Sequence, residues 1–311
     1  MGILSYLHIV ILLPFLLSPV GINKGTTVLP AGLSLPAHRQ PVESIVPDTS
    51  ETRLTLQVIA TGLNDANSLY ITPDNVLYLV EAGANRILRL DRNGVRLDSL
   101  GRMGFGDYRF DRPYDVDATN GLKIYVSDYN NHRIQIFDRR LQYLTTVDLT
   151  DISGYGRAYR PTRIAVNAFG ELFVLDEEQM SLLKFDRNGR FEFSIDLRSP
   201  GIRDMPVSMA IAGEMIFLAD PAGGIIHLVS VSGSYERFIG GMTPIHALAA
   251  YGGTVWAASG KMLYELDGRG RVIREFGIEG IDTVISVAAG KEYLYLLDSG
   301  RIHRAVIPQR D

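Results

Sequence analysis

Short runs of apolar residues alternate with polar turns from about residue 51 to the end of the chain. The runs are rich in Leu, Ile, Val, Tyr and Phe and are too short for helices, so the pattern predicts β-strands. One unit recurs six times: an apolar strand, a polar turn and a second apolar strand. The six units are NVLYLVEAGANRILRLDRNG (75–94), LKIYVSDYNNHRIQIFDRRL (122–141), ELFVLDEEQMSLLKFDRNGR (171–190), MIFLADPAGGIIHLVSVSG (215–233), TVWAASGKMLYELDGRG (254–270) and YLYLLDSGRIHRAVI (293–307).

A further short apolar run precedes each unit and another follows most of them, which makes four strands per repeat. Four strands in roughly 44 residues is typical of a propeller blade, because a lone four-stranded sheet must stack against neighbours to bury both faces. We therefore expect an all-β fold, a six-bladed β-propeller of four-stranded antiparallel blades. The residue that closes the first strand of each unit is acidic in five of the six: Glu81, Asp128, Asp176, Asp220, Ser259 and Asp298.

The last repeat ends at Ile307 after only three strands, whereas one unpartnered strand, LTLQVIA (54–60), precedes the first repeat. We expect this N-terminal strand to supply the missing outer strand of blade six and so close the ring without leaving an unpaired edge. The alternative is a free N-terminal strand.

The segment RPYDVDATNGLKIYVSDYNNHRIQIFD (112–138) resembles the NHL repeat, and GRMGFGDYRFDRP (101–113) resembles the Gly-rich connection that precedes the next NHL blade. The resemblance extends over residues 52–308, is close to the consensus in blades one to three and weakens in blades four to six. It implies a six-bladed β-propeller of the kind used mostly as a binding platform. A minority of relatives carry lyase or lactonase chemistry.

The N-terminal region differs in character from the repeats. Residues 1–22 contain an apolar core at 9–17, interrupted by Pro14, and predict a signal peptide or an N-terminal membrane anchor. Residues 23–50 are rich in Pro and small polar residues and predict a flexible linker before the propeller, residues 51–311. We therefore expect an exported protein, periplasmic, cell-surface or secreted, or one tethered to the membrane by an uncleaved N-terminal segment.

Composition and charge narrow the functional classes. The net charge of −4 offers no basic field for nucleic acid, and the absence of Cys excludes disulfides, thiolate metal sites and catalytic thiols. Beyond the linker, the four histidines show no metal-binding spacing, so we expect no tightly bound transition metal. We also expect no cofactor and a monomer. The four histidines are His132, His227, His246 and His303.

Two charged pairs recur at the same five-residue offset in consecutive blades, Glu81 with Arg86 and Asp128 with Arg133. Recurrence favours a structural clamp across the turn between the second and third strands over an active site.

One polar position recurs in the innermost strand of every blade, and it is followed by an apolar position. These side chains are expected to form a ring near one mouth of the central channel. One interpretation is that they only hydrate and pair within the channel. The other is a hydrolase or lyase site around Asp115, Arg163 and His246, with or without a divalent ion. The ring is Ser68, Asp115, Arg163, Ser208, His246 and Ser286.

Two inter-blade loops, 101–112 and 150–160, concentrate aromatic and arginine residues, the types enriched at protein interfaces. Phe110 and Tyr159 occupy positions where the NHL pattern prefers an aromatic, so we expect them in the core. The remaining residues predict a non-catalytic platform that binds a protein or glycan partner through the loop-bearing face of blades one to three. They are Met103, Phe105, Tyr108, Arg109, Tyr155 and Arg157.

Overall fold

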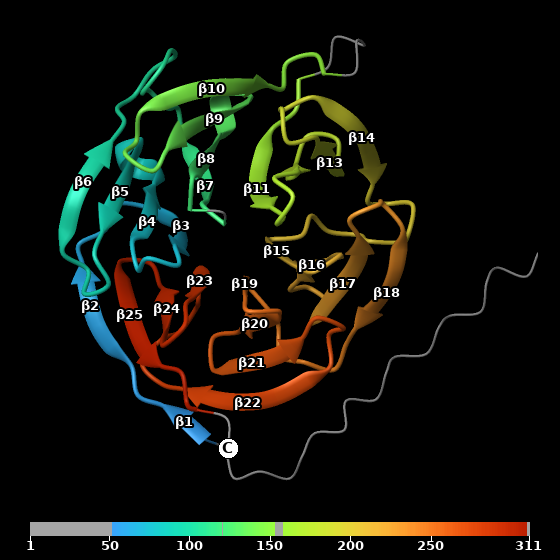
Figure 1. Ribbon diagram of the computed structural model, residues 1–311. Helices are drawn as coiled ribbons and strands as arrows, with labels where there is room; N and C mark the ends of the chain where they lie inside the picture. Colours follow the sequence, from blue (N-terminus) through green and yellow to red (C-terminus); the bar gives the residue numbers. More distant parts are fainter. Residues whose placement is uncertain (1–51, 120, 153–157, 310–311) are drawn as a thin grey trace, which may run out of the picture. The chain divides into compact units, whose positions relative to one another are not determined.

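The computed structural model describes residues 52–119, 121–152 and 158–309, which form six β-sheets arranged as blades around a central axis (Figure 1). In blades one to four the first strand lies nearest the axis and the later strands follow in sequence order toward the rim, and in blades five and six an N-terminal strand is added at the rim. This confirms the six-bladed propeller with four-stranded antiparallel blades. Two short 3₁₀ helices, η1 (Ala82–Ala84) and η2 (Tyr129–Asn131), lie in the turns between the second and third strands of blades one and two.

The first three blades follow the chain without interruption. Blade one contains β3 (Ala66–Ile71), β4 (Leu77–Glu81), β5 (Arg86–Leu90) and β6 (Arg96–Leu100). Blade two contains β7 (Pro113–Asp117), β8 (Lys123–Asp128), β9 (Arg133–Asp138) and β10 (Tyr143–Asp148). Blade three contains β11 (Pro161–Val166), β12 (Leu172–Asp176), β13 (Ser181–Phe185) and β14 (Phe191–Asp196).

The last three blades complete the ring. Blade four contains β15 (Ser208–Ala212), β16 (Met215–Asp220), β17 (Ile225–Ser230) and β18 (Tyr235–Ile239). Blade five contains β19 (Ala247–Tyr251), β20 (Thr254–Ala258), β21 (Met262–Asp267) and β22 (Val272–Ile278). Blade six contains β23 (Ser286–Ala289), β24 (Tyr293–Leu297) and β25 (Arg301–Val306).

The N-terminal strand closes the ring as the sequence predicted. β2 (Gln57–Thr61) pairs antiparallel with β25, placing Val58 opposite His303, and becomes the outer strand of blade six. The predicted strand 54–60 is divided in the structure, however. A separate strand, β1 (Thr52–Leu54), pairs in parallel with β22 and adds a fifth strand to blade five.

The hydrophobic core lies between the blades. In the described residues it consists of six clusters, and each cluster draws its side chains from two neighbouring blades. Strands inside a blade are therefore covered on both faces, and all five residues of β4 are buried. The outer strand β14 instead alternates between half-buried and exposed residues, as expected of a strand with one face in water.

Because successive strands are antiparallel, the connections separate onto two faces of the propeller. We call the loop face the one with the inter-blade connections, including residues 101–112, and the turns between second and third strands. The opposite turn face carries the turns between first and second strands and between third and fourth strands. Each innermost strand thus runs from the loop face to the turn face.

Candidate functional site

The recurring acidic residues are structural clamps, as predicted. Asp128 is fully buried, and its carboxylate accepts hydrogen bonds from Arg133 Nε (2.8 Å), Asn131 Nδ2 (2.9 Å) and the backbone N–H of Asp111 (2.8 Å). Burial raises the pKa of Asp128, and these hydrogen bonds oppose the rise. The acid therefore fastens the incoming inter-blade connection to the second and third strands of its own blade.

The same arrangement recurs in other blades with different partners. Glu81 is bound by Arg86 Nε at 2.5 Å, and Asp298 contacts His303 Nε2 at 2.8 Å. Asp176 accepts the N–H of Arg160 at 2.7 Å. A contact that repeats around the ring serves the fold of each blade rather than one reaction.

Most of the polar channel-mouth ring also serves the fold. At five of the six junctions between blades, a ring side chain bonds to the innermost strand of the next blade or to the residue before it. These bonds replace main-chain pairing, which the separate sheets do not provide. Ser68 Oγ donates to Asp115 Oδ1, Asp115 Oδ2 accepts from Ile164 N (2.8 Å), Arg163 Nε donates to the carbonyl of Val207 (2.7 Å), Ser208 Oγ accepts from Leu248 N (2.9 Å) and Ser286 Oγ accepts from Leu69 N (3.1 Å).

Among the residues of the channel-mouth ring, Arg163 contacts residues from the largest number of other blades. Besides the bond to blade four, its Nη1 donates to the carbonyl of Asn67 in blade one at 3.1 Å and lies 3.8 Å from Asp115 Oδ1 in blade two. Its guanidinium also stacks over the ring of Tyr114, 5.1 Å from the centroid. The pKa of Asp115 is raised by burial, and the positive charge of Arg163 counteracts this.

His246 is half-buried, and its backbone N–H donates to the carbonyl of Ala258 at 2.9 Å. It does not line the central cavity with Asp115 and Arg163. In the part of the chain that the structure describes, no group of three or more His, Asp or Glu side chains is positioned to hold a metal ion.

The central cavity is small. It has a volume of about 100 Å³ and is lined by the innermost strands of all six blades. Sites for drug-sized molecules usually have about 300–1,000 Å³, so this cavity suits a few water molecules or a very small ligand. Tyr70, Asp117 and Thr119 line one side of it, and alanines of blades five and six, including Ala249 and Ala288, line another.

Asp117 is a channel residue that the sequence analysis missed. It is 5% exposed and accepts the backbone N–H groups of Thr119 (2.8 Å) and Val166 (3.2 Å). Burial raises its pKa to about 7, and the nearby carboxylate of Asp115 contributes to the rise. The alternation along a strand was the available signal, because residues 115 and 117 of β7 face the same side.

The raised pKa of Asp117 predicts a pH-dependent stability. The folded protein holds this proton more tightly than the unfolded chain, so the contribution is full below about pH 4 and is lost as the pH rises through 7. Between about pH 5 and about pH 8 the wild type should lose a few kcal/mol more than Asp117→Asn, since one pKa unit corresponds to about 1.4 kcal/mol. Denaturant unfolding at several pH values measures this difference. Parallel curves for the two proteins would contradict the assignment.

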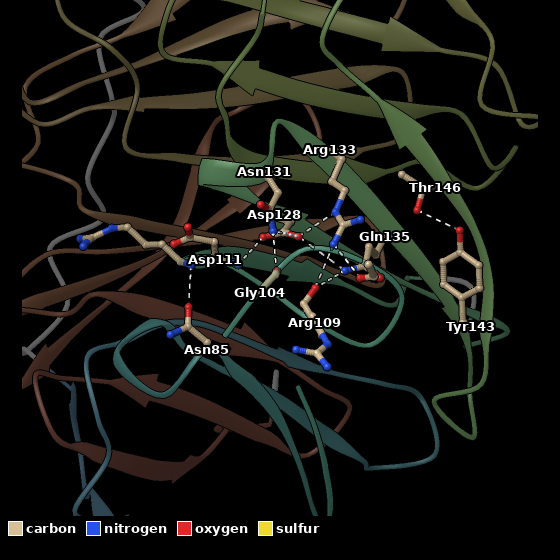
Figure 2. A network of polar contacts seen from close by, with 12 residues as sticks. Asn85, Gly104, Arg109, Asp111, Asp128, Asn131, Arg133, Gln135, Tyr143 and Thr146 are labelled. Carbon is tan, nitrogen blue, oxygen red and sulfur yellow. Dashed lines mark hydrogen bonds and ion pairs between the residues drawn. The ribbon is translucent and has the colours of Figure 1, made fainter. Parts of the chain in front are cut away.

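The loop 101–112 is held on blade two by buried side chains (Figure 2). Arg133 Nη2 donates to the carbonyls of Gly106 (2.8 Å) and Arg109 (3.0 Å), and Gln135 Nε2 donates to the same Arg109 carbonyl (2.6 Å). Asn131 Nδ2 donates to the carbonyl of Gly104 at 3.0 Å. Since Arg133 is 5% exposed and Gln135 is fully buried, the loop backbone is anchored to the blade.

Two apolar side chains project from this anchored loop. Met103 is 59% exposed and Phe105 is 75% exposed, and the Arg133 guanidinium lies 4.5 Å from the centroid of the Phe105 ring. Tyr108 is 39% exposed, and the rest of its side chain is packed on blade two. Its ring packs 6.0 Å from Phe137 and 6.1 Å from Tyr143, and its hydroxyl oxygen accepts the N–H of Tyr143 at 3.0 Å.

The other residues of the predicted patch have different outcomes. Arg109 is half-buried and fixes the loop through its carbonyl. Tyr155 and Arg157 lie outside the described residues. Phe110 is fully buried and Tyr159 is 6% exposed, which confirms both as core residues. Met103 and Phe105 are therefore the most exposed apolar side chains of loop 101–112.

The family model for the NHL repeat matches residues 110–137, the entrance and first three strands of blade two. A human relative, NHL repeat-containing protein 3, is 30% identical over 74 residues, which is 23% of this chain and 21% of that protein. The chain thus spans about a fifth of the length of that curated relative.

Solved structures support the fold over a larger part of the chain. A streptogramin B lyase matches with a TM-score of 0.58 at 12% identity, covering 81% of this chain and 97% of that one. A luciferin-regenerating enzyme matches with a TM-score of 0.59 at 11% identity, covering 82% and 95%. At these identities the likeness concerns the fold alone. The chain therefore contains a segment in blade two that matches the NHL repeat, and its six sheets have the fold of a six-bladed β-propeller.

Proposed function

We propose that this propeller is a non-catalytic binding platform that recognises a protein partner through Met103 and Phe105 on the loop face. The observation that carries the proposal is the contrast within loop 101–112. Its backbone is anchored by buried Arg133 and Gln135, yet Met103 and Phe105 face water. Anchored loops on a scaffold lose little entropy on binding, and exposed apolar side chains mark interaction sites.

A protein partner fits these side chains better than a glycan. Met and aromatic residues are enriched at protein interfaces, where they fill apolar pockets. Arg133 already occupies one side of the Phe105 ring, which leaves the rest of that ring for an apolar contact. The capture experiment described below distinguishes a protein partner from a glycan.

The alternative of a lyase or hydrolase at the channel mouth has less support. Asp115 and Arg163 are engaged with each other and with backbone groups of neighbouring blades, so neither is available as a solvated catalytic group. The cavity of about 100 Å³ beside them is also small for a substrate. The lyase and the luciferin-regenerating enzyme share the fold, which serves many functions.

The proposal includes a location outside the cytoplasm. It depends on reading residues 1–22 as a signal peptide or membrane anchor, and these residues lie outside the described part of the chain. Within the described residues there is no helix with the length and hydropathy that a membrane span needs. Fractionation of cells that express the full chain, with N-terminal sequencing of the recovered protein, tests export and cleavage.

Alanine substitution separates binding from folding. A hot-spot residue contributes about 2 kcal/mol or more, roughly thirtyfold in affinity, whereas an exposed side chain changes stability by under about 0.5 kcal/mol. We expect Met103→Ala with Phe105→Ala to lose partner capture at an unchanged melting temperature. Tyr108→Ala should instead lower the melting temperature, because this ring packs on Phe137. Leu97→Ala, at a half-exposed position in β6, is the control for loss of an apolar side chain.

The measurement is affinity capture from envelope extract, followed by titration of the captured component against each variant. If the double variant captures and binds like the wild type, the loop is not the interface. If the wild type still captures glycan-bearing components from an extract that has been treated with protease, the partner is a glycan.

A further inference from the structure

We propose that the central cavity binds a small primary ammonium compound. In this arrangement the ammonium group lies on the carboxylate of Asp117, and a short carbon chain lies against the alanines of blades five and six. The proposal concerns the axis of the propeller and not loop 101–112, so it is independent of the proposed protein-binding function.

The charges that line the cavity do not balance. Two carboxylates, those of Asp115 and Asp117, and one guanidinium, that of Arg163, line it. Arg163 Nη1 lies 3.8 Å from Asp115 Oδ1, whereas no ion pair found in the described residues involves Asp117. With both carboxylates ionised, the cavity carries one uncompensated negative charge. An unpaired buried charge is costly, so a monovalent cation is the ligand that this cavity stabilises.

Oxygen acceptors for an ammonium group lie together on this side of the cavity. The Asp117 carboxylate accepts the N–H groups of Thr119 (2.8 Å) and Val166 (3.2 Å), and a carboxylate has about four acceptor positions, so it can take a further donor. The Tyr70 hydroxyl donates to Thr119 Oγ1 at 3.1 Å, and its own oxygen keeps its acceptor capacity. An ammonium group brings three N–H donors to these oxygens.

The opposite wall of the cavity favours carbon over a metal ion. It is lined by small apolar residues of blades five and six, which leave space beside the axis. Hard metal ions take oxygen ligands on all sides, and this wall offers no polar side chain besides Ser286. The volume of about 100 Å³ limits the carbon chain to a few atoms. The apolar residues are Leu248, Ala249, Ala250, Val287, Ala288 and Ala289.

The protonation states of the cavity set the pH at which the cation binds. Burial raises the pKa of Asp117 to about 7, so its carboxylate is ionised at pH 8.5 and mostly protonated at pH 5.5. The pKa of Asp115 is also raised by burial, and loss of its charge acts in the same direction. Burial raises the pKa values of Tyr70 and of Tyr125, which pairs with Asp117 in the sheet, so both stay neutral. Arg163 remains a cation.

Calorimetric titration of the full chain with propylammonium at pH 8.5 tests the proposal. A primary amine carries its proton at this pH, as a lysine side chain does. The comparison probes are 1-propanol, propionate and potassium chloride, all at one ionic strength. We expect saturable binding of one propylammonium per chain and a rise in melting temperature, since a ligand that binds only the folded state stabilises it. The three comparison probes should give neither response.

Asp117→Asn should weaken the binding of propylammonium at least about tenfold, because it removes the charged acceptor. Asp98→Asn, at an exposed carboxylate of the outer strand β6, is the matched control and should bind like the wild type. The melting temperatures of both variants without ligand show whether they fold. The wild type alone should bind at least about tenfold more weakly at pH 5.5 than at pH 8.5, which tests the site without any variant.

Four results would overturn the proposal. One is the absence of saturable binding at pH 8.5, and another is equal affinity of the wild type at the two pH values or of a folded Asp117→Asn variant. An equal response to potassium chloride would assign the cavity to a metal ion or to salt alone. An equal response to 1-propanol would show that the apolar wall, and not the carboxylate, selects the ligand.

Discussion

Deletion of residues 52–61 should lower the free energy of unfolding by several kcal/mol. The deletion removes β2, and with it the outer strand of blade six, so the edge of β25 and the apolar face around Ile302 become exposed. It also removes Leu54, which packs in the cluster that contains Phe276 and Ile278. Apolar surface contributes about 25 cal/mol per Å² buried, and an unpaired strand edge also favours association between copies.

Thermal or denaturant unfolding of the full chain and the deletion variant measures the effect. A shorter deletion, residues 52–54, is the matched control, because it removes β1 and leaves the ring closed by β2. We expect it to destabilise the protein less than the full deletion. Equal melting temperatures for the full deletion variant and the wild type would show that β2 does not close the ring in solution.

Asp115→Ala should lower stability by about 3 kcal/mol or more, the usual effect of removing one member of a buried ion pair. The substitution leaves the N–H of Ile164 without its acceptor and removes the carboxylate beside Arg163. Asp115→Asn should cost less, because its side-chain oxygen can still accept the N–H of Ile164. Arg163→Met combined with Asp115→Ala completes a double-mutant cycle, and the two residues should show strong coupling.

This prediction also separates the structural role from a catalytic one. A residue that only holds blades together affects the melting temperature first. If Asp115→Ala and Arg163→Met retained the wild-type melting temperature, these side chains would be free for another role at the channel mouth. Such a result would favour the hydrolase or lyase alternative.

The sequence predicted the propeller because its two signals are repeated. Apolar strands at a spacing of about 44 residues, with an acid such as Asp128 or Asp176 closing the second strand, fix the number of blades and their order. Ring closure followed from counting strands. β1 carries no such signal, since three residues without a repeat partner are indistinguishable from the end of a linker.

The candidate site was predicted less completely, because its contacts depend on distances between neighbouring blades that the sequence does not give. The sequence placed Asp115 and Arg163 at the channel mouth, but the separation of neighbouring sheets decides whether they face water or bond to the next blade. Tyr108 illustrates the same limit, because its positive φ of 61° directs the loop so that the ring packs on blade two. Loop geometry of this kind leaves no periodic trace in the sequence.

Site-specific photo-crosslinking tests the protein-binding role of the loop face most directly. A benzophenone amino acid replaces Phe105 in one variant and Leu97 in another, both at exposed apolar positions. After irradiation of intact cells, we expect a discrete covalent adduct with a second protein from position 105 and none from position 97. Absence of an adduct at 105, or the same adduct from both positions, would contradict the proposal that Met103 and Phe105 form the contact surface.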